Sequence, residues 1–204
     1  MNNRINLKDL KIKILELIIL SGILIGNPSQ LYAPIPPKLK NNLENVIVKS
    51  PKKQELISHK DARMYVKRVI KKINPPKPIN EDYIMKVIKI ESSFDIYAES
   101  EAGARGLMQI MPKTWIDLEK KLSFEEFAYN PFVNIKVGII EKTRLIKLFK
   151  REYSNWKNLT EQEQLKLIAA ASNAGYNKLK KHDWKIDLTP NETRNHIKKI
   201  FKEF

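Results

Sequence analysis

Residues 91–112 read ESSFDIYAESEAGARGLMQIMP, a glutamate followed by a turn rich in glycine. The apolar residues Ile84, Val87 and Ile88 precede Glu91 at three- and four-residue spacing, so all four share one face of a helix. Glu91 is therefore expected on the core side, at the end of that helix. Burial and the carbonyl end of a helix both disfavour a charged carboxyl, so Glu91 is expected to hold a proton that it can donate. The alternative is a frayed helix end with Glu91 turned to solvent.

The turn after Glu91 combines a permissive backbone with mixed side-chain chemistry. Gly103 and Gly106 favour a tight turn that lets the backbone approach a ligand closely. Gln109 lies among apolar residues, and its amide can both donate and accept hydrogen bonds. This mixture suits a sugar ring, although Gln109 can equally satisfy buried backbone groups. Pro112 is expected to begin the next helix.

Five motifs follow one another in order from Glu91 to the end of the chain. They are Glu91-Ser92-Ser93-Phe94, Gly106-Leu107-Met108-Gln109-Ile110-Met111-Pro112, Asn130-Pro131 with Asn134-Ile135 and Gly138, Ala169-Ala170 with Asn173-Ala174-Gly175, and Glu192-Thr193-Arg194. In this register the chain resembles the soluble-type lytic transglycosylases (SLT domain), whose domain is related to goose-type lysozyme. The resemblance covers residues 57–204 and implies an all-α, lysozyme-like helical domain.

The resemblance also implies an activity and a set of site residues. The expected enzyme is a peptidoglycan lytic transglycosylase, which cleaves the β-1,4 bond between N-acetylmuramic acid and N-acetylglucosamine and leaves 1,6-anhydromuramic acid ends. Glu91 would protonate the bridging oxygen and then, as a base, activate the muramoyl C6 hydroxyl. The substrate-binding residues implied are Ser100, Gln109, Met111, Asn173 and Glu192.

Several of these residues also have a structural interpretation. Ser100 can hydrogen-bond its own turn, and the methionines can fill the core. Glu192 follows Thr189 and Pro190 at the spacing of a capping box, so it can simply cap the last helix. Only Glu91 has a functional interpretation that clearly outweighs the structural one.

The chain departs from the family pattern at two positions. Ser172 stands where the family usually has a tyrosine, and His196 stands where it often has an aromatic residue. Loss of a ring removes stacking surface for a sugar. Either another ring, such as Tyr176 or Trp115, compensates, or glycan binding is weaker.

Two other functions remain open at this stage. A hydrolytic lysozyme on the same fold would use Asp95, Glu99 or Glu101 to position a water. A cell-wall-binding or secretion-apparatus module would keep the fold without turnover, which the intact Glu91 argues against.

Composition limits the cofactors and partners. The 204 residues include no cysteine and only three scattered histidines, so neither a disulfide nor a metal site is expected, and no cofactor. The net charge of +15 favours polyanions in general. The lysines form no stripe interleaved with aromatic residues, so no nucleic acid is expected as a partner. The expected partner is the peptidoglycan glycan strand, bound by a monomer.

The amino-terminal region predicts export. Basic residues precede an apolar run from Ile14 to Gly26, so residues 1–33 are predicted to be a signal peptide or a membrane anchor. Residues 34–54 form a Pro/Lys-rich linker, and residues 55–204 the catalytic domain. The protein is therefore expected in the periplasm or elsewhere in the cell envelope.

Apolar periodicity predicts helices throughout the catalytic domain. The predicted helices cover residues 56–73, a segment capped by Asn80 that bears Glu91, residues 134–150 and residues 162–173. No stretch alternates for long enough to predict a sheet.

Overall fold

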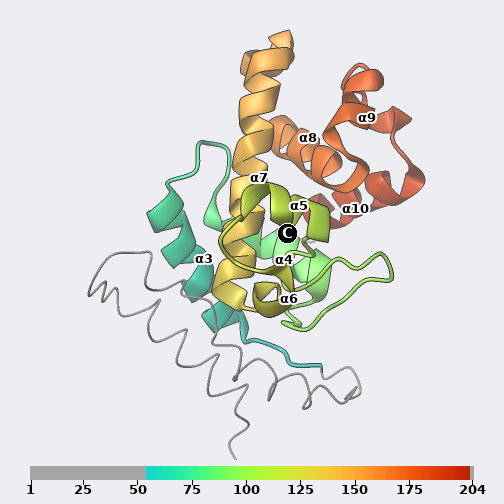
Figure 1. The fold of residues 1–204 in the computed structure, drawn as a ribbon. Coiled ribbons are helices and arrows are strands. Elements are labelled where there is room, and N and C mark those ends of the chain that lie inside the picture. The colour runs from blue at the N-terminus through green and yellow to red at the C-terminus, as the bar shows by residue number, and fades with distance from the viewer. Residues whose placement is uncertain (1–53, 203–204) are drawn as a thin grey trace, which may run out of the picture. The chain divides into compact units, whose positions relative to one another are not determined.

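The computed structural model describes residues 54–202, and this part of the chain is helical (Figure 1). Its elements are α3 (His59–Ile73), α4 (Glu81–Ser92), α5 (Pro112–Leu118), α6 (Phe124–Phe127), α7 (Pro131–Glu152), η2 (Ser154–Asn158), α8 (Glu161–Ala174), α9 (Tyr176–Lys181), η3 (Ile186–Leu188) and α10 (Asn191–Lys202). Within the described residues, β pairing is limited to three isolated bridges. The predicted all-α class is confirmed.

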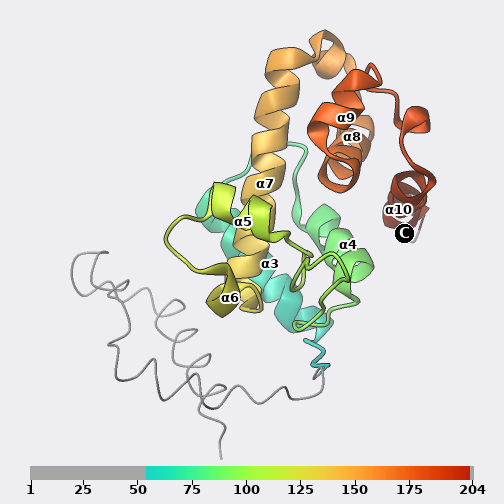
Figure 2. The ribbon, with the colours of Figure 1, turned by 45° about the vertical axis from the view of Figure 1, so that its right-hand side comes forward.

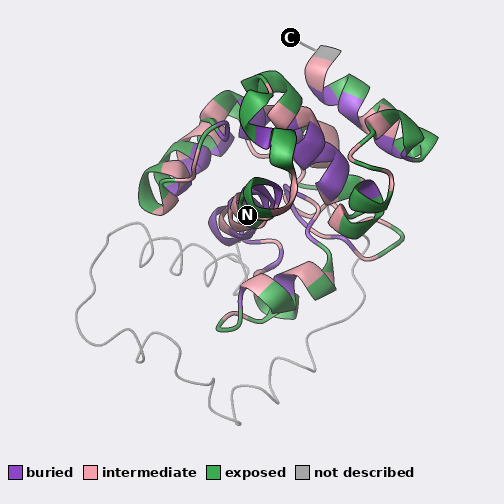
Figure 3. Cartoon of the chain, turned by 90° about the horizontal axis from the view of Figure 1, so that it is seen from above, coloured by how far each residue is buried: buried purple, intermediate pink, exposed green. Residues whose placement is uncertain are grey.

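Helix α7 is the long helix around which the others are arranged (Figures 1 and 2). It packs against α3, α5 and α8. Asn130 caps its first turn by accepting a hydrogen bond from the N–H of Val133 at 3.0 Å, and Pro131 occupies the first helical position. Twelve of the 22 residues of α7 are buried, which is typical of a central helix. Figure 3 shows buried residues gathered on the inward sides of the helices and exposed residues on their outward sides.

Helix α4 begins at the predicted cap and carries Glu91 at its other end. The side chain of Asn80 accepts a hydrogen bond from the N–H of Tyr83 at 2.9 Å. The face that bears Ile84, Val87 and Ile88 is buried, as the periodicity predicted. The helix ends at Ser92, and the left-handed backbone of the next residue, Ser93 (φ 51°), stops the helical hydrogen bonds.

Helix α10 packs against both α8 and α4, so the end of the chain returns to the helix that bears Glu91. The capping box expected at its start is wrong. The N–H of Arg194 bonds to the carbonyl of Pro190, which puts Pro190 at the cap position, and the Thr189 hydroxyl donates instead to the carbonyl of Ile186 at 2.6 Å. The helix therefore begins one residue later than the pattern suggested.

The predicted signal or anchor segment, residues 1–33, lies outside the described residues, as does all but the last residue of the predicted linker, 34–54. Between residues 54 and 202 there is no helix long and apolar enough to span a bilayer.

Candidate functional site

Glu91 lies half-buried in the last turn of α4, with 24% of its side chain exposed. The alternative of a frayed end with Glu91 in solvent is therefore wrong. The two residues after the helix, Ser93 and Phe94, both have left-handed backbones, with φ of 51° and 68°. Such conformations are uncommon outside glycine and cluster at functional sites. They turn the chain sharply away from the helix immediately after Glu91.

His196 of α10 contacts Glu91. Its Nε2 lies 3.3 Å from Glu91 Oε1, and 14% of the imidazole is exposed. The contact joins the first motif of the chain to its last helix. Sequence reasoning treated His196 only as a missing aromatic residue, because nothing local to either residue indicates that α10 returns to α4.

A second polar contact joins α10 to α8, one turn before His196. The hydroxyl of Thr193 donates to Asn173 Oδ1 at 2.6 Å. Asn173 is exposed, whereas Thr193 is buried. Helix α10 thus carries both Thr193, which binds the predicted site residue Asn173, and His196, which contacts Glu91.

Two buried hydroxyls on the neighbouring helices have no hydrogen-bond partner among the described residues. They belong to Tyr83 of α4 and Ser172 of α8. Burial raises the pKa of Tyr83, and the charges of Glu141 and Glu91 raise it further, so the phenol stays neutral.

The turn after α4 is held by its own hydrogen bonds. Ser100 Oγ accepts from the N–H of Ala104 at 3.0 Å. Gln109 Nε2 donates to the carbonyls of Ala98 and Gly106, each at 3.0 Å. The structural interpretations of Ser100 and Gln109 are therefore observed directly.

Asn134 is a site-shaping residue whose role the sequence analysis missed. Fully buried on α7, it accepts from the N–H of Met108 at 2.8 Å and donates to the carbonyls of Arg105 and Ala128 at 2.9 and 2.8 Å. These bonds fasten the glycine turn to the central helix. The role of Asn134 could have been predicted from the sequence, because an asparagine within a buried apolar stripe needs hydrogen-bond partners.

Gly106 is required by packing against this asparagine. Its φ is +78°, and a side-chain carbon there would lie 2.4 Å from both Ala128 O and Asn134 Nδ2. Gly103 also has a left-handed backbone (φ 84°), but a side-chain carbon would have open space around it. The close approach at Gly106 is thus to the protein's own backbone and to Asn134.

The remaining predicted residues have different degrees of exposure. Met111 is 40% exposed at the start of α5, whereas Met108 is buried against Gly138. Glu192 is exposed in the first turn of α10. Among the described residues, no hydrogen bond or ion pair directly connects Glu91 to Met111, Glu192, Ser100 or Gln109.

Trp115 and Tyr176, the two rings suggested as substitutes for the missing aromatic residues, both pack against other side chains. Trp115 is 1% exposed, packs edge-on against Phe124, and donates its indole N–H to the carbonyl of Leu122 at 2.7 Å. Tyr176 packs against Phe149 and Trp184 and donates its hydroxyl to Glu152 at 3.1 Å. Trp115 is therefore a core residue, and Tyr176 belongs to an aromatic cluster at the carboxyl end of α7.

The carboxylates proposed to position a water are mostly engaged elsewhere. Asp95 Oδ1 accepts from the N–H groups of Glu55 and Tyr97. Glu99 accepts from Arg105 Nε at 3.2 Å and from the Tyr129 hydroxyl at 3.0 Å. Burial and the bond to Glu99 raise the pKa of Tyr129 to about 12. Glu101 is exposed.

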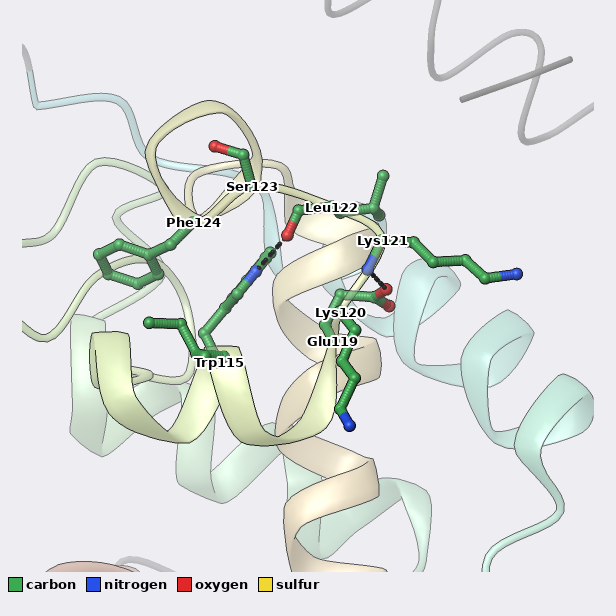
Figure 4. A pocket seen from close by; sticks show the side chains of 8 residues that line it. Trp115, Glu119, Lys120, Lys121, Leu122, Ser123 and Phe124 are labelled. Atoms are coloured by element: carbon green, nitrogen blue, oxygen red, sulfur yellow. Dashed lines mark hydrogen bonds between the residues drawn. The ribbon is translucent and has the colours of Figure 1, made fainter. Parts of the chain in front are cut away.

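Figure 4 shows a surface hollow beside α5, and Glu91 is not among the residues that line it. Its lining comprises Trp115, Ile116, Glu119, Lys120, Lys121, Leu122, Ser123 and Phe124. The bonds drawn there hold the α5–α6 connection together, with Lys121 N–H donating to Glu119 at 3.2 Å. In the described part of the chain, histidine and acidic side chains form no group of three that could hold a metal ion.

The family model and the relatives that match this chain are all described as transglycosylases. The family model described as "Transglycosylase SLT domain" matches residues 68–189. The membrane-bound lytic murein transglycosylase C of Actinobacillus pleuropneumoniae serotype 5b is 28% identical over 168 residues, covering 69% of this chain and 45% of that protein. The protein of the same name from Glaesserella parasuis is 31% identical over 98 residues, covering 45% and 26%.

A solved structure also shares the fold. It is an inactive variant of the lytic transglycosylase Slt from Pseudomonas aeruginosa, 24% identical, with a TM-score of 0.53 over 68% of this chain and 22% of that one. The chain spans less than half the length of the curated relatives that it matches.

Proposed function

Because the chain belongs to the transglycosylase SLT domain family, we propose that it is a peptidoglycan lytic transglycosylase with Glu91 as its catalytic acid and base. The observation that carries this proposal is the placement of Glu91, half-buried at the end of α4 beside His196. An acid must be sheltered enough to keep a proton and open enough to reach a substrate. With 24% of its side chain exposed, Glu91 is partly sheltered from water and still open to a ligand.

The proposed reaction uses one carboxyl in two steps. Glu91 first gives its proton to the bridging oxygen as the bond from that oxygen to the muramoyl C1 breaks. The resulting carboxylate then removes the proton of the C6 hydroxyl while the C6 oxygen bonds to C1. The product carries a 1,6-anhydro ring, water is not consumed, and Glu91 ends protonated, as it began.

The surroundings of Asp95 and Glu99 disfavour these two carboxylates as the water-positioning group of a hydrolytic lysozyme. That reaction needs a carboxylate near Glu91 to position a water. Asp95 and Glu99 instead serve the backbone and an arginine within the turn. Substrate contacts are proposed for the exposed Met111, Asn173 and Glu192, whereas Ser100 and Gln109 are proposed to act by shaping the turn.

Location in the cell envelope is part of the same proposal. It is supported by the basic and apolar pattern of residues 1–33 and by curated relatives that are named as membrane-bound. A fusion of residues 1–33 to a reporter that works only outside the cytoplasm should be active. An expressed but silent reporter would contradict export.

The function is tested by mass spectrometry of purified peptidoglycan digested with the protein. Anhydro ends and reducing ends differ by one water, so the two chemistries give products of different mass. We expect anhydromuropeptides as primary products. Reducing ends would indicate a lysozyme, and the absence of any product would indicate a binding module.

A further inference from the structure

His196 is the polar contact of Glu91 that the proposed reaction leaves without a role. The imidazole is positioned by α10, which is packed against neighbouring helices on both sides of it. One turn earlier Thr193 bonds to Asn173, and one residue later Ile197 is buried, followed by Ile200. With 14% exposure, the ring has little freedom to swing away from Glu91.

The geometry determines which oxygen of Glu91 the imidazole can serve. Nε2 lies 3.3 Å from Oε1, which leaves Oε2 as the other oxygen of the carboxyl. At 3.3 Å the contact lies within ion-pair distance, but it does not have the geometry of a formed N–H to oxygen hydrogen bond. Such contacts at catalytic sites are often long without substrate and shorten when it binds.

We propose that His196 is a positioning residue, a neutral imidazole whose Nε2–H donates to Glu91 Oε1 and keeps Oε2 directed at the glycan. This inference rests on the proposed role of Glu91. In the first step, the proton leaves Oε2 for the bridging oxygen, and the bond to Oε1 stays in place. In the second step, Oε2 takes the proton of the C6 hydroxyl. His196 neither gains nor loses a proton in either step.

A donor of this kind has a specific advantage over an aromatic ring at the same position. A ring would restrict the carboxyl only by packing, whereas an N–H fixes which oxygen is occupied. A cationic imidazole would be unsuitable, because it would favour the carboxylate over the acid that the first step needs. The neutral donor is compatible with both steps.

The test compares His196→Gln with His196→Phe in the full chain. A glutamine can place an amide N–H near the position of Nε2, while phenylalanine keeps the ring shape and removes the donor. The rate of anhydromuropeptide release from soluble glycan strands gives kcat and KM. We expect His196→Gln to stay within about threefold of the parent, and His196→Phe to lose ~10–100-fold in kcat with KM nearly unchanged.

Two results would overturn the proposal. Equal activity of His196→Phe and the parent would show that the donor is dispensable, and equal loss in both variants would show that packing or titration of the imidazole matters instead. Thermal unfolding of each variant identifies any loss that is due to folding.

A second measurement does not depend on activity. Nitrogen-15 NMR of the imidazoles, with the His196→Gln variant assigning the signal, should show His196 neutral at pH 7 with its proton on Nε2. A cationic ring or a proton on Nδ1 contradicts the inference even if the enzyme is active. Failure of the proposed function is seen separately, as an absence of anhydro product from the parent or full activity of Glu91→Gln.

Discussion

Glu91 and Glu152 occupy matching places in two helices but have different surroundings. Glu91 is in the last turn of α4 and Glu152 is the last residue of α7, with 24% and 23% of their side chains exposed. Glu152 accepts hydrogen bonds from Arg151, Lys180 and Tyr176. Within residues 54–202, the polar contact of Glu91 is the one with His196. Exposure and helix position therefore do not distinguish Glu152 from the proposed catalytic carboxyl of Glu91, whereas the number and charge of their hydrogen-bond and ion-pair partners do.

The two regions are also stabilised by different means. Around Glu91 the chain relies on left-handed turns and on the buried Asn134, which binds backbone groups. Around Glu152 it relies on ion pairs and on stacked rings, with Phe149 parallel to Trp156 at 4.8 Å between centroids. The first arrangement fixes a backbone around a site, and the second closes the far end of the long helix.

The largest expected effect comes from removing each carboxyl in turn. Glu91→Gln should lower turnover about a thousandfold or more, because the amide can neither give nor take the proton. Glu152→Gln, the matched control, should leave turnover within about threefold. Release of anhydromuropeptides measures both variants, and circular dichroism confirms their folding. Comparable losses in the two variants would remove the functional distinction between the two glutamates.

The next effect concerns the turn beside Glu91. Gly106→Ala should lower the free energy of unfolding by about 3 kcal/mol, because the new carbon meets Ala128 O and Asn134 Nδ2 at 2.4 Å. In Gly103→Ala the new carbon meets no other atom, so the free energy of unfolding should fall by about 1–2 kcal/mol because of the left-handed backbone alone. Urea unfolding of the two variants measures the difference. Equal losses would mean that backbone conformation, and not packing against Asn134, explains Gly106.

Local patterns predicted much of this architecture. Apolar periodicity and the cap at Asn80 act within a few residues, so the helices that carry them could be located from the sequence. The helix predicted over 134–150 begins three residues earlier, at Pro131, because the cap at Asn130 was not recognised. The short helices α6 and α9 were not predicted, because four to six residues carry too little periodicity to stand out. The start of α10 was wrong by one residue because Thr189 bonds backward to Ile186 and not forward into the helix.

The candidate site was less predictable than the helices. Glu91 could be proposed as a site residue from its own helix and the motif that follows. Its contact with His196 depends on how α10 packs against α4, which no local pattern encodes. Likewise, Trp115 was a candidate groove ring until its position in the core was known.

A moderate effect is expected from acid on the Glu152 region. Hydrogen bonds from Arg151, followed by those from Lys180 and Tyr176, lower the pKa of Glu152 from 4.5 to about 2. A carboxyl with a lowered pKa in the folded state adds stability that is complete above about pH 4.5 and is lost as the pH falls toward 2. The thermal midpoint of the parent should therefore exceed that of Glu152→Gln at pH 7, and the gap should shrink below pH 4.5. A gap that stays constant down to pH 2.5 would show that the Glu152 contacts add no stability through its charge.

The smallest effects test the two regions through a pair of tyrosines. The Tyr83 hydroxyl, on the helix of Glu91, is buried without a partner among the described residues, while the Tyr176 hydroxyl bonds to Glu152 at 3.1 Å. A buried polar group without a partner costs stability, and a formed hydrogen bond adds about 0.5–1.5 kcal/mol. Tyr83→Phe should therefore leave the free energy of unfolding unchanged or raise it by about 1 kcal/mol, and Tyr176→Phe should lower it by a similar amount. Both substitutions remove the same oxygen and keep the ring, so the opposite signs in urea unfolding would come from the surroundings alone. A loss at Tyr83 as large as that at Tyr176 would mean that the region around Glu91 satisfies its polar groups as fully as the region around Glu152 does.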